Sequence, residues 1–284
     1  MKSIFTLYIA LIACIACAQK KEKTFTSPEG YDFNQPEKIT LPHMLQEISG
    51  ITFKDGEPHT LFAQQDEKGS LFYFNPDATK DMKAVTFGPE GDYEDLALTG
   101  KWVILLRSDG SFFTFPFSST YPEQITAVKT EKLLPKGEYE SLATGDDQKL
   151  YALCKQCAVD KDGKQTTGYT LQVSPNGTIS QLTSFSIPTK NIKNVVSFKG
   201  KAFRPSALTK HPTNNEWYIL SSINKLLVIT DFSWKVKAAY ALNPKLFNQP
   251  EGIAFDKQHN LYISNEAGNK GNATLLKFSY RKNK

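Results

Sequence analysis

The chain has 284 residues, of which 40% are hydrophobic and 12% aromatic, so it carries enough apolar side chain for a full core. Its formal net charge of +5 at pH 7 is small, and the lysines are scattered rather than gathered in stripes. This pattern argues against a nucleic-acid-binding protein and is typical of a solvated surface.

The first residues predict an export signal. Lys2 precedes an apolar run from Ile4 to Ala16, and polar residues follow from Gln19. Such a run is short for a bilayer span and is typical of the apolar core of a signal peptide. We expect residues 1–17 to form the signal and anchor, residues 18–35 a polar tether, and residues 36–284 the folded domain.

The apolar run ends in a motif that resembles a bacterial lipobox, in which a small residue precedes the cysteine to be lipidated. Cys14 has the better upstream residues, with Leu11 three places before it, whereas Cys17 is followed at once by polar residues. Cys17 is the preferred lipidation site, Cys14 is the alternative, and an ordinary cleaved signal would carry no lipid. The prediction is a monomeric lipoprotein of the bacterial cell envelope, anchored to a membrane and facing the periplasm or the outer membrane.

A motif of four residues, called the phrase below, then occurs five times. Each copy has glutamate or serine first and an aliphatic residue third, and the copies begin at Ser49, Glu94, Glu140, Ser206 and Glu251, spaced by 45, 46, 66 and 45 residues. A period in the forties built from short strands is the signature of a β-propeller with one blade per repeat. The sequence predicts an all-β, five-bladed propeller. Six blades are the alternative if the long third repeat hides one.

Each repeat continues with two further apolar segments that predict strands. The second strands are expected at 61–63, 103–106, 150–153, 217–220 and 261–263, and the third at 71–74, 112–117, 169–173, 226–230 and 274–280. Pairs such as Asp55-Gly56 and Asn176-Gly177 supply the positive φ of tight hairpins. The extra residues of the third repeat fall in a polar loop at 158–168 and in a segment at 188–201 that favours a short helix.

The fifth repeat stops after its third strand. Its outer strand is expected from Lys38–Leu41, which lies just before the first repeat. Pairing the two ends closes the ring and removes exposed sheet edges. In the third repeat, Cys154 and Cys157 predict a local disulfide or two free thiols, because a single CxxC without a second pair is weak evidence for zinc or redox chemistry.

The repeat geometry predicts one functional site. The start of each first strand and the end of each second strand lie at the same mouth of the central channel, so the phrase residues meet there. The candidate cation ligands are Glu94, Glu140, Glu251, Ser49 and Ser206. The other residues expected at this mouth are Asp66, Arg107, Lys155, Arg204, Asn265 and Glu266.

Three carboxylates near one axis cannot all stay ionised without a proton or a cation among them. Calcium suits this set because it takes carboxylate, hydroxyl and carbonyl oxygens. Two alternatives remain open at this point: Arg107 and Lys155 neutralise the glutamates directly, or an organic ligand alone occupies the mouth. The chain has no HExxH, GxSxG, Walker A or GxGxxG motif, so no catalytic group is assigned.

The last repeat carries a family resemblance. Glu251–Asp256 followed by Asn260–Glu266, with Tyr93–Ala97 earlier, resembles the SdiA-regulated (YjiK-like) family of envelope propellers over roughly residues 37–280. The resemblance implies a periplasmic or membrane-anchored propeller with calcium at its centre, and Glu94, Glu140 and Glu251 match the family's repeated acidic position. Arg107 departs from the acidic or polar residue expected there. A weaker likeness links the fold to gluconolactonase-like and phytase-like hydrolases, without their full ligand sets.

These observations favour an envelope lipoprotein whose propeller binds a hard cation, and a small ligand or an envelope protein, at its channel mouth. One rival is a calcium-dependent hydrolase of a phosphate ester or lactone. Another is a ligand-free interaction scaffold. Fold alone does not separate these functions.

Overall fold

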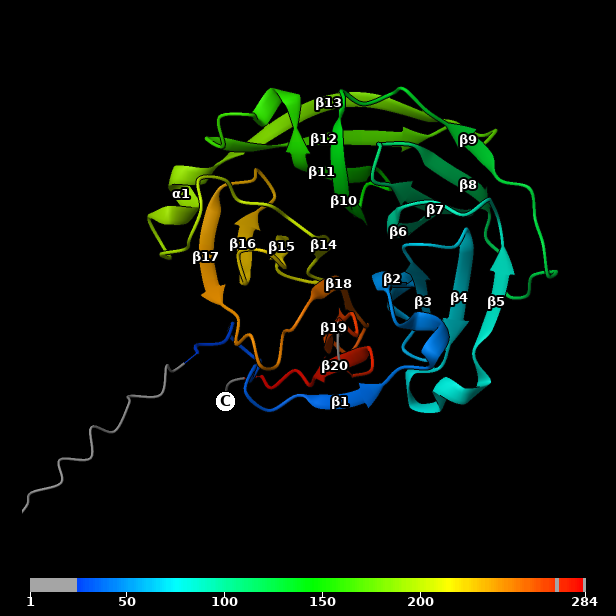
Figure 1. Ribbon diagram of the computed structural model, residues 1–284, viewed down its shortest axis with the longest axis horizontal. Helices are drawn as coiled ribbons and strands as arrows, with labels where there is room; N and C mark the ends of the chain where they lie inside the picture. The colour runs from blue at the N-terminus through cyan, green and yellow to red at the C-terminus, as the bar shows by residue number, and fades with distance from the viewer. Residues whose placement is uncertain (1–24, 269–270, 283–284) are drawn as a thin grey trace, which may run out of the picture.

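Five four-stranded antiparallel sheets surround a central axis in the computed structural model, which describes residues 25–268 and 271–282 (Figure 1). Each sheet is one blade, so the five-bladed propeller is confirmed and the six-bladed alternative is wrong. The predicted signal segment with Cys14 and Cys17 lies outside the described residues. No helix of the described part is long and apolar enough to cross a membrane.

The strands follow the same order in each blade, from the axis outward, and blades 1 to 5 are numbered here by chain order. The innermost strands are β2 (Ile48–Phe53), β6 (Tyr93–Thr99), β10 (Gly137–Thr144), β14 (Ala207–Lys210) and β18 (Pro250–Phe255). The second strands are β3 (Leu61–Gln65), β7 (Trp102–Arg107), β11 (Leu150–Cys157), β15 (Glu216–Ser221) and β19 (Leu261–Asn265). The third strands are β4 (Ser70–Phe74), β8 (Phe112–Pro116), β12 (Gln165–Val173), β16 (Leu226–Asp231) and β20 (Thr274–Phe278). The outer strands are β5 (Lys83–Thr86), β9 (Val128–Thr130), β13 (Ile179–Pro188), β17 (Val236–Ala241) and β1 (Glu37–Thr40).

The core lies between neighbouring blades. Leu61 and Ala63 of β3 pack in one buried cluster with Tyr262 and Leu275 of blade 5. This packing explains why the second strands are apolar on successive residues, since both of their faces meet a neighbouring sheet. Burying one leucine in this way contributes about 1.5–3 kcal/mol to stability.

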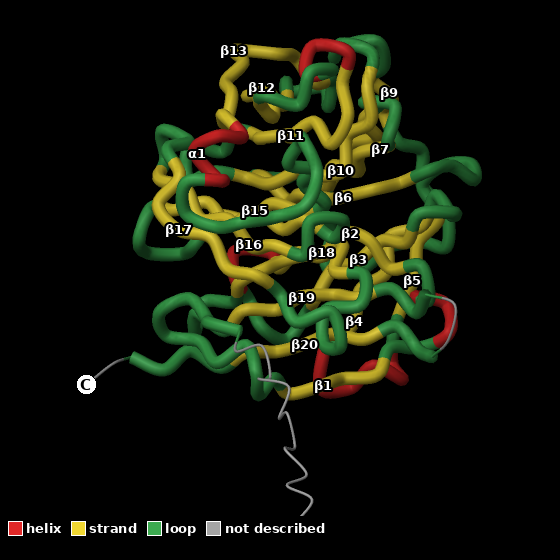
Figure 2. The backbone as a smooth tube through the Cα atoms, turned by 60° about the vertical axis from the view of Figure 1, so that its left-hand side comes forward, coloured by secondary structure: helices red, strands yellow, loops and turns green. Residues whose placement is uncertain are grey.

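The N-terminal strand closes the ring as expected. β1 pairs antiparallel with β20, with Ile39 opposite Leu275, and the two strands lie side by side in Figure 2. The described part of the predicted tether, residues 25–35, also belongs to this blade. Phe33 is 2% exposed, and its ring centroid lies 4.7 Å from that of Phe278. The boundary expected at residue 36 is therefore wrong, because apolar side chains within the polar-looking segment pack on blade 5.

The long third repeat builds a larger blade rather than an additional one. Its third and fourth strands, β12 and β13, contain 9 and 10 residues and form the longest hairpin of the molecule's described part. β12 begins at Gln165, inside the loop expected at 158–168, so that loop is shorter than predicted. The expected short helix is present as α1 (Thr189–Lys193).

Four short 3₁₀ segments complete the described structure: η1 (His43–Leu45), η2 (Lys54–Gly56), η3 (Pro76–Asp81) and η4 (Ala158–Asp160). Asp55 and Gly56 in η2 both have positive φ, as their turn signal predicted.

Candidate functional site

β-bulges set the position of the recurring glutamates. Tyr93 pairs with Arg107 while Asp95 pairs with Leu106, so Glu94 is an additional residue in β6. The same irregularity occurs in β10 at Glu140 and in β18 at Glu251. A bulge bends its strand and re-aims the side chain that it carries, and such bulges are frequent beside functional sites. In these three copies, the first residue of the repeated phrase is therefore the additional residue of a β-bulge.

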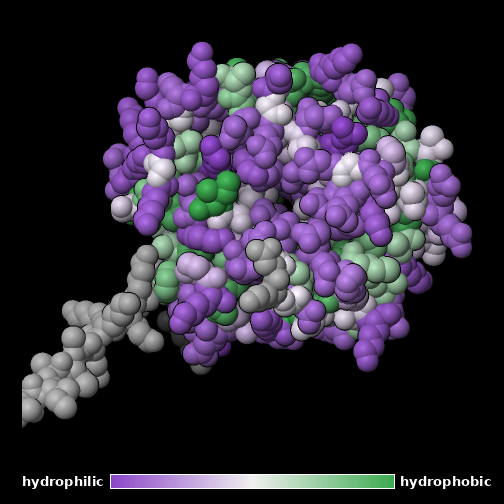
Figure 3. Space-filling view, in the orientation of Figure 1, coloured by the Kyte–Doolittle hydropathy of each residue, from purple (hydrophilic) through white to green (hydrophobic). Residues whose placement is uncertain are grey.

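The ends of the second strands lie beside these bulged starts, as the repeat alignment predicted. The backbone N–H of Asp66 donates to the carbonyl of Glu47, 3.2 Å away, just before β2. In blade 5 the N–H of Glu266 likewise donates to the carbonyl of Gln249, 3.0 Å away. The structure therefore brings the second-strand residues and the phrase residues to one end of the channel. The face seen in Figure 3 is mostly hydrophilic and is hollowed near the propeller axis.

Three carboxylates at this mouth form the tightest acidic cluster among the described residues. One oxygen from each of Glu47, Asp66 and Glu266 lies within 4.8 Å of the others, and all three residues are half-buried. Oδ1 of Asp66 is buried without a hydrogen-bond partner. Oε2 of Glu266 accepts a 2.6 Å hydrogen bond from Nε2 of Gln249. Two of the three were expected at this mouth, and Glu47 was missed.

A sequence signal for Glu47 exists. It stands two residues before the first residue of the phrase, and every repeat has a polar residue there: Glu47, Asp92, Glu138, Arg204 and Gln249. This second polar position lies outside the phrase, and the bulge places it next to the end of the second strand.

Burial and mutual repulsion raise the pKa values of the carboxyl groups at the mouth. The pKa of Glu94 rises to about 9, through burial first and then through the charges of Asp92, Glu251 and Asp66. That of Glu266 rises to about 8, through burial first and then through Glu251, Asp66 and Glu47. Carboxyl groups from blades 5, 1 and 2 are therefore close enough to raise one another's pKa values.

Two further carboxyl groups behave in the same way. Burial, with the neighbouring charges of Glu47 and Glu67, raises the pKa of Asp66 to about 6. Burial also raises the pKa of Glu251, although the hydroxyl of Ser222 and the ammonium of Lys155 oppose the rise. Each of these groups is destabilised in its ionised form, which is the condition that a bound cation relieves.

Lysine and arginine neutralise only a small part of this acidic mouth. Lys155 forms an ion pair with Glu140, which is 5% exposed, and its Nζ lies 3.1 Å from Oε1 of Glu138. Arg107 instead pairs with Asp109 at 2.8 Å, so of the alternative in which Arg107 and Lys155 neutralise the glutamates, only the pair between Lys155 and Glu140 is present. In the described part of the chain, no basic group lies within ion-pair distance of the carboxylates of Glu47, Asp66, Glu94, Glu251 and Glu266.

The polar uncharged residues link blades at the same mouth. The hydroxyl of Ser206 donates to the carbonyl of Pro250 at 2.8 Å and accepts from the N–H of Ser222 at 3.2 Å. The carbonyl of Ser49 accepts a 3.0 Å hydrogen bond from the hydroxyl of Ser264. Roles for Ser49 and Ser206 as cation ligands stay predictions.

The remaining two expected mouth residues, Asn265 and Arg204, differ in their surroundings. Asn265 is buried beside the carboxylate cluster, with Oδ1 unpartnered. Arg204 is separate from it and lines a cavity between blades 3 and 4.

The cluster has dimensions that suit a single divalent cation. Calcium binds oxygen at about 2.3–2.6 Å, so two ligands on opposite sides of the ion lie about 5 Å apart. Magnesium requires about 2.0–2.1 Å, which brings opposite ligands to about 4 Å. The oxygens of Glu47, Asp66 and Glu266 lie within 4.8 Å of one another, which is close enough for one cation of either size to contact all three.

No protein-family model matches the chain, and no curated protein matches it. Among solved structures, glutaminyl cyclase from Myxococcus xanthus is similar at 13% identity and a TM-score of 0.51, covering 87% of this chain and 96% of that one. Virginiamycin B lyase from Staphylococcus aureus is similar at 14% identity and a TM-score of 0.45, covering 85% and 69%. A luciferin-regenerating enzyme is similar at 10% identity and a TM-score of 0.46, covering 86% and 95%. At these identities the likeness shows the β-propeller fold alone.

Proposed function

We propose that this protein is a calcium-binding β-propeller of the bacterial cell envelope, with its cation site at the mouth formed by Glu47, Asp66 and Glu266. The observation that carries the proposal is the set of three carboxylate oxygens within 4.8 Å, together with the lack of an ion-pair partner for them among the described residues. Glu94 and Glu251 add two further buried carboxyl groups beside this set. Glu140, an expected ligand, is neutralised by Lys155 and contributes less.

Binding of calcium would remove an electrostatic cost of the folded state. The carboxyl groups of the mouth have pKa values above their ordinary range, so ionising them together is unfavourable without a cation. A divalent ion takes the place of the protons and bridges blades 5 and 1, which donate Glu266 and Asp66. The ion would then also stabilise the closure of the ring.

Elemental analysis and thermal melts test this proposal. The purified protein should contain calcium, and adding calcium to chelator-stripped protein should raise its melting temperature. At a hundredfold excess over the dissociation constant, the stabilisation is about 2.7 kcal/mol. Asp66→Asn should reduce this effect strongly, whereas Glu123→Gln, an exposed carboxylate away from the mouth, should leave it unchanged. A melt of the stripped wild type that calcium does not shift would contradict the proposal.

The envelope location is supported by two features. Cys154 and Cys157 form a disulfide with a Cα–Cα distance of 5.9 Å, and disulfides persist in oxidising compartments. The N-terminal segment with its lipobox-like end would anchor the propeller to a membrane through Cys17, with Cys14 as the alternative, and membership of the SdiA-regulated family would agree with this location.

Replacing Cys17 with serine should release the protein from the membrane fraction. Release by Cys14→Ser alone would assign the lipid to the other cysteine.

Calcium-dependent hydrolysis is the functional alternative. Beside the three proposed ligands, Glu94 has a pKa of about 9, so its carboxyl group is protonated near neutral pH and can donate a proton to a leaving group. A panel of phosphate esters, carboxylate esters and lactones, assayed with calcium and with chelator, separates a hydrolase from a binding module. Turnover that calcium supports and chelator abolishes would favour the enzyme.

A further inference from the structure

A cavity of about 780 Å³ opens between blades 3 and 4. One wall is the end of β11 with the Cys154–Cys157 disulfide, continued by the turn at residues 158–163. The opposite wall is the segment 199–204 that leads toward β14, with Ile223 beside it. This volume lies within the range of small-molecule sites, about 300–1,000 Å³.

The lining of this cavity is strongly basic. Its two acidic side chains are already bonded within the fold. The carboxylate of Asp160 accepts from the N–H and the hydroxyl of Thr167, each at 2.7 Å, and that of Asp162 lies 3.2 Å from Nζ of Lys164. The basic side chains are Lys136, Lys155, Lys161, Lys199, Lys201 and Arg204.

Most of these cations lack a counter-charge. Lys155 is committed to Glu140 and Glu138. For the other five basic groups, the described residues offer no carboxylate within ion-pair distance. Several unpaired cations held around one cavity repel each other, and a bound anion that carries several negative charges would relieve this repulsion.

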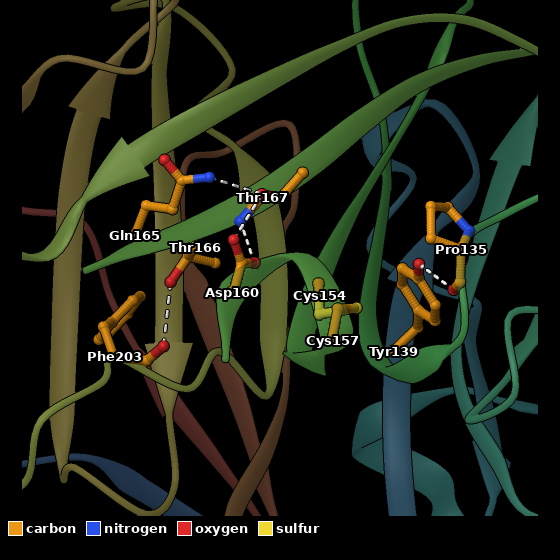
Figure 4. Close-up of a disulfide and its surroundings, with 9 residues drawn as sticks. All are labelled: Pro135, Tyr139, Cys154, Cys157, Asp160, Gln165, Thr166, Thr167 and Phe203. Atoms are coloured by element: carbon orange, nitrogen blue, oxygen red, sulfur yellow. Dashed lines mark hydrogen bonds between the residues drawn. A yellow bond between two sulfur atoms is a disulfide. The ribbon is translucent and has the colours of Figure 1, made fainter. Parts of the chain in front are cut away.

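The segment that carries three of these cations is held in place from both blades. The hydroxyl of Thr166 in β12 donates to the carbonyl of Phe203 at 2.9 Å, as Figure 4 shows beside the disulfide. From blade 4, Oδ1 of Asn224 accepts from the N–H of Arg204 at 2.9 Å, and its Nδ2 donates to the carbonyl of Lys199 at 3.3 Å. A wall fixed in advance lowers the ordering cost of binding.

We propose that this cavity binds a soluble organic ligand that carries two or more phosphate groups. Lysine ammonium groups are compact donors that bind phosphate as point charges, and a single carboxylate would leave most of the cations unmatched. The cavity is bounded by two blades and has a volume of about 780 Å³, so it suits a small molecule rather than a nucleic acid. The inference does not depend on the calcium site.

Calorimetric titration with inorganic pyrophosphate as the probe tests this inference. The protein is first freed of divalent cations on a chelating resin, so that binding through calcium is excluded. The wild type should bind one pyrophosphate, with an affinity that falls as salt is added. Lys199→Ala/Lys201→Ala removes two exposed cations of the cavity and should weaken binding at least tenfold. Arg204→Gln should weaken it in the same direction.

The matched control is Lys80→Ala/Lys235→Ala, which removes two exposed lysines that stand outside the cavity and pair with no described carboxylate. This control should bind pyrophosphate as the wild type does. Unchanged melting temperatures of all variants establish that each is folded. Absence of binding to metal-free wild type, or equal weakening in the control, would overturn the inference. Binding that requires added calcium would also overturn it, because the probe would then be held at the other site.

Discussion

At the scale of single residues, the mouth contains some carboxylates with a basic ion-pair partner and others without one. Glu140 is buried against Lys155, whereas Asp66 and Glu266 share their cluster with Glu47 and no basic group. The sequence predicted an excess of acid at the mouth but not this division, because the partner of a long side chain depends on local turns. Arg107 illustrates the difficulty: the turn after β7 offers it Asp109, two residues away.

Two substitutions distinguish these roles. Lys155→Ala strands the carboxylate of Glu140, which is 5% exposed, and should lower the free energy of unfolding by ~3–5 kcal/mol. Arg107→Ala removes an ion pair with the exposed Asp109 and should cost about 1 kcal/mol or less. Urea unfolding of both variants measures the difference. A larger loss for Arg107→Ala than for Lys155→Ala would show that Arg107 is the residue that neutralises the mouth.

The raised pKa values of the mouth predict how stability depends on pH. The glutamate side chain of an unfolded chain has a pKa of about 4.3. In the folded protein, the pKa values of Glu94 and Glu266 are about 9 and about 8. The folded state therefore binds more protons than the unfolded state between these limits. The free energy of unfolding must then fall as pH rises through this window. The stabilisation that the protonated groups retain near pH 5 is lost by about pH 9.

Thermal melts in chelator from about pH 5 to about pH 9 measure this dependence, with Glu94→Gln/Glu266→Gln as the comparison. The double variant carries amides that cannot ionise, so its melting temperature should decline less over the range than that of the wild type. Calcium should remove most of the wild-type decline, because the ion replaces the protons. Parallel curves for the two proteins would assign the pH dependence to other groups.

At the scale of elements, the close approach of the inner strands explains the phrase. A Cβ added to Gly50 would lie 2.4 Å from Oδ1 of Asp95, and one added to Gly252 would lie 2.4 Å from the carbonyl of Ser49. Oδ2 of Asp95 accepts a 2.6 Å hydrogen bond from the N–H of Leu142 in the next blade. The second residue of the phrase is therefore either a small residue, as Gly50 and Gly252 are, or one whose side chain bonds to the next blade, as that of Asp95 does. The repeat was visible in the sequence, but its cause, a crowded axis, required the structure.

The first described residues form a second element-scale feature, because they pack on blade 5. Phe33→Ala should destabilise the protein by ~3–5 kcal/mol, since the ring is 2% exposed between Phe247 and Phe278. Phe232→Ala is the matched control, because that ring is 64% exposed, and its effect should be within about 0.5 kcal/mol. Equal unfolding free energies for the two variants in urea would mean that the segment around Phe33 is a free tether.

At the scale of the whole molecule, the sequence predicted the fold better than the site. Five repeats, their strand order and the closure by β1 followed from periodicity and from one missing outer strand. Glu47 was missed because it precedes the phrase, and Phe33 was missed because its neighbours are polar. Contacts between blades join residues far apart in the chain, so no local pattern encodes them. The result is a propeller with an acidic channel mouth on blades 5, 1 and 2 and a separate basic cavity between blades 3 and 4.

The central claim is that the carboxylates of Glu47, Asp66 and Glu266 bind calcium, and calorimetric titration of chelator-stripped protein at pH 7 tests it most directly. The account predicts one calcium per chain, with release of protons to the buffer, because the pKa of Glu266 is about 8 before the ion binds. Asp66→Asn/Glu266→Gln should lose this binding while Glu123→Gln retains it. A wild type that takes up no calcium, or a double variant that binds it as tightly as the wild type, would contradict the account.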